Sequence, residues 1–360
     1  MLDTPERILL YLPNWVGDAV MFTPTIRAIR KGFPDAQIAL LGRENPAAVL
    51  TPNPWCDEIL IDDGNIRRVI RALREKSFDL AVLGPNSFRS ALIIRLAGIK
   101  RRLGYVRDAR GWLLTDKIVP PKDKSGRFTI IPAIDYYLTL AEYLGCPADD
   151  KRMELGVSSP DAQFAQTLFD KANIHDDRPI VLINPGASYG PAKMYPADRF
   201  ARVADLLIER RQAQIILNAA PAERPIASAV QRAMRYPVSI NLAEENNSLG
   251  LLKAVVARSN LMITNDTGPR HFAAALGVPV VTIFGPTNPA WTDIYFEHER
   301  IVRVNVPCGP CQMKRCPLPA GDEYHQCMRK ITPEMVVSAA EELLDTPKNT
   351  NTSVDVRTTR

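Results

Sequence analysis

An acidic residue near the N-terminus is the first side chain whose position suggests chemistry. Asp18 closes the run NWVGD at 14–18, which follows an apolar stretch over residues 7–13. Gly17 permits a tight backbone turn, so Asp18 is expected near the start of the next helix. There it is either a plain helix-capping residue or a general base that takes a proton from an attacking hydroxyl. Spacing alone favours the capping role.

A loop in the second half of the chain carries residue types that bind phosphate. The run NPGAS at 184–188 follows another apolar stretch, and Lys193 comes a few residues later. Gly186 lets the backbone approach a ligand closely, Ser188 offers a hydroxyl group, and Lys193 supplies a positive point charge. The three suit a pyrophosphate, although an ordinary strand-to-helix loop would look the same.

The strongest local signal is the run TNDTGPRH at residues 264–271, which opens a short apolar helix. Amide groups at a helix N-terminus are unsatisfied donors and bind anions readily. Thr267 and Gly268 would bring such donors against a phosphate. An isolated Asp-Thr-Gly is compatible with a simple helix cap. At the end of a strand in the second of two similar domains, it indicates a site for a nucleotide diphosphate.

The usual loops of two large enzyme classes are missing from the sequence. No G-x-G-x-x-G follows the first apolar run, and the P-loop pattern G-x-x-x-x-G-K-[ST] is absent as well. Hydride transfer with a dinucleotide and ATP hydrolysis by these loops are therefore disfavoured.

Short apolar runs alternate with helix-like stretches along most of the chain. This pattern is typical of parallel sheets covered by helices, so we predict an α/β protein of two Rossmann-like doubly wound domains facing a cleft. We expect domains over 1–165 and 172–345, joined across roughly residues 145–178, and a disordered tail over 346–360. Expected strands cover residues 7–13, 37–43, 57–63, 79–85, 179–186, 214–220, 261–268 and 279–286, and expected helices cover 19–31, 66–76, 196–211, 222–235, 248–259, 271–278 and the stretch after Thr332. Ligands of such sheets bind beyond the carboxyl ends of the strands, where the polar runs above fall.

The overall composition fits two globular domains in the cytoplasm. The chain has 360 residues, and no stretch of eighteen apolar residues occurs that would span a membrane. The first seven residues include two acidic ones and lead directly into a strand, unlike a secretory signal.

Positive charge is concentrated in one segment of the first half. Residues 64–127 hold sixteen Lys and Arg against five Asp and Glu, or +11, whereas the whole chain carries +5. The segment is either a solvated face or a surface that attracts the phosphates of an acidic substrate or an anionic membrane. Candidate groups for acceptor carboxylates and phosphates are Arg89, Arg101, Arg102 and Arg107. A non-catalytic nucleic-acid-binding protein ranks low, because interleaved aromatic residues on a recognisable module are missing.

Four of the six cysteines crowd near the C-terminal end. Their spacing could supply a structural tetrahedral zinc site, but it is less regular than paired C-x-x-C knuckles. Buried free thiols are the alternative, and a catalytic zinc site is disfavoured because no open His-rich site accompanies them. The four residues are Cys308, Cys311, Cys316 and Cys327.

Taken together, the motifs resemble those of the lipopolysaccharide heptosyltransferases, glycosyltransferase family 9. The similar stretches are LPNWVGDAVMFTPTIRAIR, PNSFRSALIIRLAGIKRRLGY and LLTD in the first half, and NPGASYGPAKMYP, TNDTGPRHFAAALGVPVVTIFGPTNP and CGPCQMKRCP in the second. The resemblance runs from about residue 7 to residue 344, in family order.

The resemblance implies a GT-B fold and a metal-independent, inverting transfer of heptose from ADP-heptose, with no cofactor. The acceptor would be an anionic, lipid-linked core oligosaccharide that already bears one heptose, so contact with the inner membrane would be peripheral and on its cytoplasmic face. Family positions place the base at Asp18. The donor's pyrophosphate would be held by Lys193 and by Thr267-Gly268. Asp266 and His271 match family positions that line the donor site, and Glu223 matches a carboxylate that holds the ribose hydroxyls. Gly17 and Ser188 are further candidate donor-binding residues.

Some positions depart from the family pattern. Relatives often carry Glu at the position of Ser188, Arg-Trp in place of Met194-Tyr195, and another pair in place of Pro269-Arg270. These positions lie on the donor side, so they bear on the identity of the sugar more than on the reaction. A related transferase that adds the first heptose, or another nucleotide-activated sugar, is the alternative.

Overall fold

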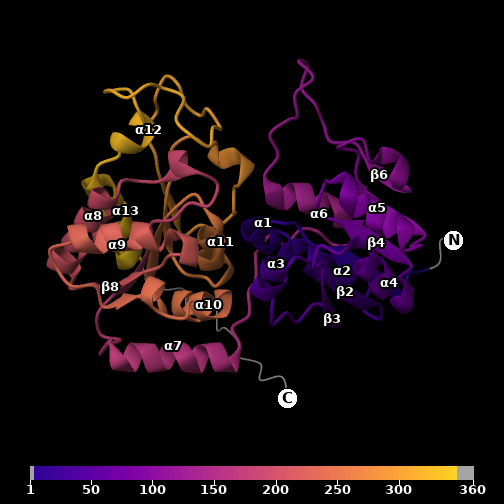
Figure 1. Ribbon diagram of the computed structural model, residues 1–360, viewed down its shortest axis with the longest axis horizontal. Helices are drawn as coiled ribbons and strands as arrows, with labels where there is room; N and C mark the ends of the chain where they lie inside the picture. Colours follow the sequence, from indigo (N-terminus) through magenta and orange to yellow (C-terminus); the bar gives the residue numbers. More distant parts are fainter. Residues whose placement is uncertain (1–3, 347–360) are drawn as a thin grey trace. The chain divides into compact units, whose positions relative to one another are not determined.

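The computed structural model describes residues 4–346, which divide into two compact units (Figure 1). Met1–Leu155 and Ala290–Tyr295 belong to the first unit, and Gly156–Pro289 and Phe296 onward belong to the second. Most of the predicted tail, residues 347–360, lies outside the described residues. Within residues 4–346, none of the helices combines the length and the apolarity that a membrane crossing requires.

The first unit is a parallel sheet with the strand order β3-β2-β1-β4-β5-β6. Its strands are β1 Arg7–Tyr11, β2 Gln37–Gly42, β3 Glu58–Ile61, β4 Leu80–Leu83, β5 Arg101–Tyr105 and β6 Asp116–Ile118. Its helices are α1 Val16–Met21, α2 Thr23–Gly32, α3 Glu44–Val49, α4 Ile66–Lys76, α5 Phe88–Leu96 and α6 Ala133–Tyr143. The order reverses direction between β1 and β4, which makes the carboxyl ends of these two strands the switch point where such sheets bind ligands.

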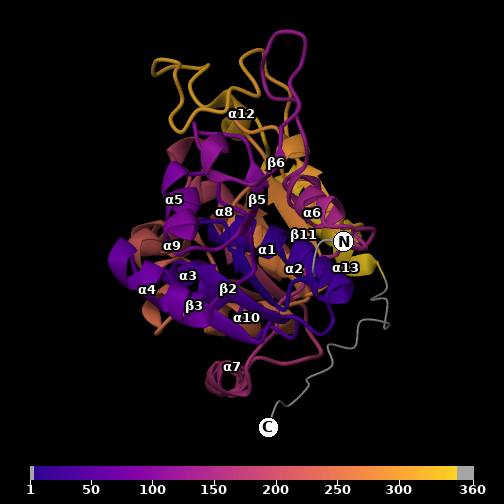
Figure 2. The same cartoon turned by 90° about the vertical axis from the view of Figure 1, so that its right-hand side faces the viewer.

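Both faces of the first sheet are covered by helices. Helices α4 and α5 pack against each other on one face, and α2 packs against α6 on the other (Figure 2). Side chains alternate along β1, so Leu9 and Tyr11 enter the core beneath α4 and α5. This alternation aims the Tyr11 ring at that face, just before the chain reaches residues 14–18.

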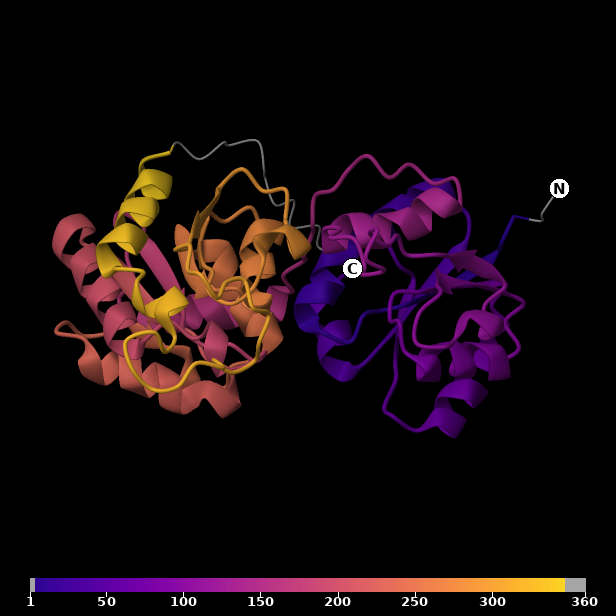
Figure 3. The same ribbon diagram turned by 90° about the horizontal axis from the view of Figure 1, so that it is seen from above.

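The second unit repeats the same topology with the order β12-β11-β10-β7-β8-β9. Its strands are β7 Ile180–Asn184, β8 Gln214–Leu217, β9 Ile240–Asn241, β10 Leu261–Asn265, β11 Val280–Ile283 and β12 Glu299–Val302. Its helices are α7 Ser159–Lys171, α8 Ala197–Arg211, α9 Arg224–Ala233, α10 Leu249–Arg258, α11 Gly268–Ala275, α12 Gln326–Arg329 and α13 Pro333–Asp345. The reversal lies between β7 and β10, so the two runs predicted to bind phosphate follow the two strands of the switch point. Figure 3 shows α13, in yellow, alongside α8, against which it packs.

Two local features differ from the expected elements. The segment predicted to join the domains contains α7, whose N-terminus is capped by Ser158 and which packs against α10 within the second unit. The helix expected over 19–31 is two helices, because the chain turns at Phe22 between α1 and α2. As a result α1 begins at Val16, and both Gly17 and Asp18 lie within it.

Candidate functional site

An ion pair joins the two loops of the second unit that were predicted to bind phosphate. The Lys193 ammonium lies 2.5 Å from Oδ2 of Asp266 and donates to its backbone carbonyl at 3.0 Å. Thr287 Oγ1 donates to the same carboxylate oxygen at 2.7 Å. Burial by itself raises the pKa of Asp266, but the charges of Lys193 and Arg270 outweigh burial and hold that pKa below its usual value. The structure therefore places Lys193 and Asp266 together as a charged pair.

A second buried pair supports the first. Arg270 is fully buried, and its Nε and Nη2 donate to the two carboxylate oxygens of Glu299 at 2.6 and 2.8 Å. Its Nη1 lies 3.9 Å from Oδ1 of Asp266. Such a bidentate pair is rigid as well as strong. Sequence reasoning noted Arg270 only as a departure and missed Glu299, which gave no sequence signal because it lies 29 residues away at the start of β12.

The N-terminus of α11 presents backbone donors beside this pair. The helix starts at Gly268, and Thr267 occupies the cap position with an extended backbone and no capping bond from its side chain. Pro269 has no N–H, and the Arg270 N–H bonds to the Thr267 carbonyl. The N–H groups of Thr267 and Gly268 are therefore the ones suited to an anion.

His271 lies in the first turn of α11 and is neutral. Its side chain is buried, and burial together with the charge of Arg270 lowers its pKa to about 3. The buried Nδ1 of His271 has no hydrogen-bond partner among the described residues. The ring therefore adds no charge at the start of α11.

Glu223 reaches the same edge of the sheet from the loop after β8. A Cβ placed on Gly186 would lie 2.1 Å from a carboxylate oxygen of Glu223, so only glycine allows this approach. Burial raises the pKa of Glu223, and backbone N–H groups of Ala220 and Ala187 partly offset that rise. Ser188, beside this contact, is exposed. The structure thus brings the predicted ribose and pyrophosphate residues to one edge.

A chain of side-chain amides crosses the carboxyl ends of β8, β7 and β10. Asn247 donates to Asn218 at 2.9 Å, Asn218 to Asn184 at 2.6 Å, and Asn184 to Thr264 at 3.0 Å. These bonds fix the loops after the three strands. Asn247 also lines a cavity of about 240 Å³, and its buried Oδ1 has no partner in the described part of the chain. The remaining lining residues are Ala219, Pro221, Arg224, Leu242, Ala243 and Glu245.

In the first unit, Asp18 is the third residue of α1. The cap position is held by Trp15, so Asp18 is in the first turn without being the N-cap residue. The carboxylate is half-buried, and after burial itself it is the main cause that raises the pKa of Tyr137, which places it close to that phenol. Its role as a base stays a prediction, because the donor residues belong to the other unit.

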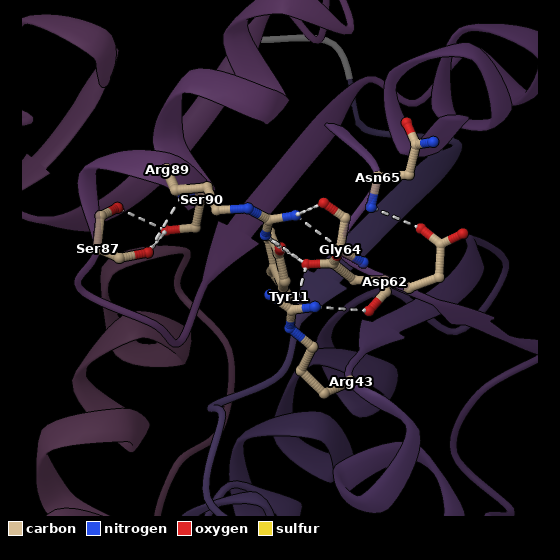
Figure 4. A network of polar contacts seen from close by, with 9 residues as sticks. Tyr11, Arg43, Asp62, Gly64, Asn65, Ser87, Arg89 and Ser90 are labelled. Atoms are coloured by element: carbon tan, nitrogen blue, oxygen red, sulfur yellow. Dashed lines mark hydrogen bonds and ion pairs between the residues drawn. The ribbon is translucent and has the colours of Figure 1, made fainter. Parts of the chain in front are cut away.

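Arg89 belongs to a buried hydrogen-bond network at the carboxyl edge of the first sheet (Figure 4). Its two terminal nitrogens bond Asp62 at 2.6 and 2.9 Å, and Tyr11 donates its hydroxyl to Asp62 at 2.5 Å. Arg43 approaches the same carboxylate at 3.8 Å. Burial opposes ionisation of Asp62, but the bonds from Arg89, Tyr11 and the Gly64 N–H lower its pKa to about 2.

Replacing Arg89 by Met is expected to lower the free energy of unfolding by about 3 kcal/mol, because Asp62 would stay buried without its main partner. The pKa of Asp62 is depressed in the folded state, so this contribution is present above the ordinary value of 3.8 and is lost as pH falls towards 2. Urea unfolding at pH 7 and pH 3 checks the prediction. An equal loss at both pH values, or an effect only on acceptor KM at pH 7, would contradict it.

The other candidate arginines differ in how many of their side-chain nitrogens already have partners within the protein. Arg101 pairs with Asp116 at 3.1 Å, and Arg102 donates to the backbone carbonyls of residues 99, 100 and 113. Arg107 lies 4.3 Å from the centre of the Phe128 ring, and its buried Nε has no hydrogen-bond partner among residues 4–346. Acceptor binding by these arginines stays a prediction.

Sequence reasoning missed Arg110, which organises the loop after β4. Its side chain is fully buried and donates to the carbonyls of Pro85 and Ser87, to the Ser90 hydroxyl and to the Asn86 side chain. Burial lowers the pKa of Arg110 to about 10, which leaves it charged at neutral pH. The buried Arg110 side chain thus fixes the loop after β4, at the switch point of the first sheet.

The cysteine segment is in contact with the Lys193 loop. All six cysteines are free thiols, and in the described part of the chain no group of three or more His, Cys, Asp or Glu is placed to hold a metal ion. The His325 N–H bonds Cys316 at 3.3 Å, and the Gln326 amide lies 3.8 Å from Cys308. His325 also bonds the Ala192 carbonyl at 2.8 Å.

Comparisons with known proteins point to one enzyme family. A sequence model described as glycosyltransferase family 9 (heptosyltransferase) matches residues 66–321. A lipooligosaccharide heptosyltransferase 2 of Haemophilus ducreyi is 30% identical over 94% of this chain and 99% of that protein.

Solved structures match over nearly the whole chain. The Escherichia coli ADP-heptose lipopolysaccharide heptosyltransferase II is 28% identical, with a TM-score of 0.77 over 94% of this chain and 98% of that one. A glycosyl transferase family 9 structure from Veillonella parvula gives a TM-score of 0.80 at 23% identity over 94% and 97% of the two chains, which supports the fold. The two repeated doubly wound units are therefore those of a GT-B fold.

Proposed function

Since the chain belongs to glycosyltransferase family 9, the heptosyltransferases, we propose that it transfers heptose from ADP-heptose to a lipopolysaccharide inner core that already bears one heptose. The observation that carries this proposal is the meeting of Lys193, Asp266 and the start of α11 at the switch point of the second sheet. Fixed donors at that place suit the pyrophosphate of a nucleotide sugar.

We call Lys193, Asp266 and the start of α11, together with the neighbouring Arg270 and Glu299, the donor cradle. Its surroundings suit the nucleoside part of a nucleoside diphosphate. Glu223 lies at the same edge and can accept hydrogen bonds from ribose hydroxyls. The cavity beside it, about 240 Å³, has room for a purine, and Asn247 is one of its lining residues. We therefore place the adenosine part of the donor over Glu223 and in this cavity.

In the proposed reaction Asp18 takes the proton of the acceptor hydroxyl while the hydroxyl oxygen bonds the anomeric carbon. The bond from that carbon to the pyrophosphate oxygen breaks on the opposite face, so the configuration inverts and ADP leaves with the electron pair. Lys193 and the N–H groups of Thr267 and Gly268 stabilise the negative charge on the leaving group. Because these donors are fixed in place, the step needs no metal ion.

The direct test is mass spectrometry after incubation of the enzyme with ADP-heptose and a truncated inner core bearing one heptose. We expect a product heavier by one heptose. A matched acceptor that lacks the first heptose should not react. Transfer to that acceptor instead would identify a first-heptose transferase, and preference for a UDP- or GDP-sugar would overturn the donor assignment.

Because the acceptor is lipid-linked, we also propose peripheral contact with the cytoplasmic face of the inner membrane through the basic first unit. Trp112 is 61% exposed, 6.1 Å from the Phe88 ring and 5.6 Å from the Arg95 guanidinium. An exposed aromatic ring beside cations suits anionic headgroups.

Flotation with vesicles is expected to show binding to anionic vesicles and little binding to neutral ones. Replacing Trp112 by Ala should weaken the anionic binding severalfold, because the ring no longer enters the headgroup region. Tyr143, an exposed aromatic residue on α6, provides a matched control when replaced by Ala. Equal binding to both vesicle types would contradict the proposal.

A further inference from the structure

The donor cradle lacks net positive charge. Its two cations, Lys193 and Arg270, are matched by the carboxylates of Asp266 and Glu299, and Glu223 adds a third carboxyl group. His271 is neutral, because its pKa is lowered to about 3. A nucleoside diphosphate brings further negative charge, and backbone N–H groups contribute only partial charges. A cation outside these pairs would therefore add a positive charge that the paired groups do not supply.

Lys314 is a cation of this kind, outside the two buried pairs. Its ammonium group lies 5.6 Å from the centre of the Tyr189 ring, and Lys193 approaches the same ring at 4.7 Å. Both cations thus share one aromatic ring as a platform. Lys314 is exposed, and its ammonium contacts this ring rather than a carboxylate in the described part of the chain. Its charge is not neutralised, in contrast to that of Lys193.

The backbone around Lys314 is fixed to the loop that carries Lys193. The Ala192 N–H donates to the Lys314 carbonyl at 3.1 Å, and the Tyr189 hydroxyl donates to the Gln312 carbonyl at 2.8 Å. A Cβ on Gly190 would lie 2.5 Å from the Lys314 carbonyl oxygen, so the two loops touch through glycine. The position of Lys314 is therefore set by the loop that it would assist.

We propose that Lys314 is a second cation for the diphosphate of the nucleotide sugar, held beside Lys193 by the Tyr189 ring. This inference rests on the proposed function and adds a residue to its donor site. Lys193 is partly satisfied by Asp266, whereas Lys314 contributes its full charge to the donor and to the departing diphosphate. The cysteine-bearing segment 308–327 is thereby part of the donor site.

The test compares Lys314→Met with Arg315→Met, which removes the same charge from the next, exposed residue. Calorimetric titration with ADP and with adenosine is carried out at low and high salt. For Lys314→Met we expect about tenfold weaker ADP binding, an unchanged affinity for adenosine and a smaller dependence on salt. Lys314→Arg should keep the ADP affinity within about threefold, and Tyr189→Leu should weaken ADP binding as Lys314→Met does.

Three results would overturn the inference. One is an unchanged ADP affinity in Lys314→Met. Another is an equal loss of ADP affinity in Arg315→Met, which would indicate a non-specific electrostatic effect of positive surface charge. A parallel loss for adenosine would indicate a structural role instead. These results leave the proposed function standing provided that the wild-type protein binds ADP. If the wild-type protein binds no ADP, the proposed donor is wrong and the inference is wrong with it.

Discussion

Asp18→Asn is expected to lower kcat by at least about 1,000-fold while ADP affinity stays within about twofold of the wild-type value. The substitution keeps the size of the side chain but removes the group that accepts the proton, and general bases typically contribute 100- to 10,000-fold. Because Asp18 lies in the first unit and the proposed ADP site in the second, donor binding should be unaffected.

The surroundings of Asp18 suit a carboxylate that accepts a proton. The residue lies in the first turn of α1, where the helix dipole favours negative charge, and it is half-buried. It lies near the buried phenol of Tyr137, whose pKa is raised mainly by burial and next by the Asp18 charge. Tyr137 thus stays protonated, and the carboxylate is the group suited to take a proton.

Steady-state kinetics and ADP titration of the variant check this prediction. The matched control is Asp35→Asn, which removes the same charge from an exposed position in the same unit and should leave turnover unchanged. Near-wild-type turnover in Asp18→Asn would rule out the residue as the base.

Sequence reasoning predicted most strands that build the two sheets, because buried parallel strands read as short apolar runs between helices. The two runs that it predicted to bind phosphate do follow β7 and β10, where parallel strands end at one edge, and their binding of phosphate stays a prediction. Strand β5 was missed, since Arg101 and Arg102 read as basic surface although Leu103 and Tyr105 are buried. Helix α7 was missed despite the Ser158 cap.

Side-chain partners were the part that the sequence could not predict. Arg89 was proposed to grip an acceptor anion, yet the structure shows both its terminal nitrogens on Asp62, 27 residues away at the end of another strand. Glu299 and Arg270 likewise lie far apart in the sequence and are brought together by the fold. Such pairs depend on how strands lie side by side, and charge counts along the chain carry no information about that.

Lys193→Met is expected to reduce transfer by about 100- to 1,000-fold and to lower the free energy of unfolding by about 3 kcal/mol. The activity falls because a cation proposed to contact the leaving pyrophosphate is removed. The stability falls because Asp266 is 4% exposed and, within residues 4–346, its carboxylate would retain the bond from Thr287 and the more distant charge of Arg270. Steady-state kinetics with the donor and urea unfolding without ligand measure the two effects.

The double variant Lys193→Met/Asp266→Asn separates these two roles. Removing the Asp266 charge abolishes the unpaired buried carboxylate, and the amide oxygen of Asn can still accept from Thr287, so most of the lost stability should return. Transfer should not return, since no cation replaces Lys193. If transfer recovers with stability, Lys193 serves mainly to neutralise Asp266, and the charge on the leaving group must be met by other groups of the cradle.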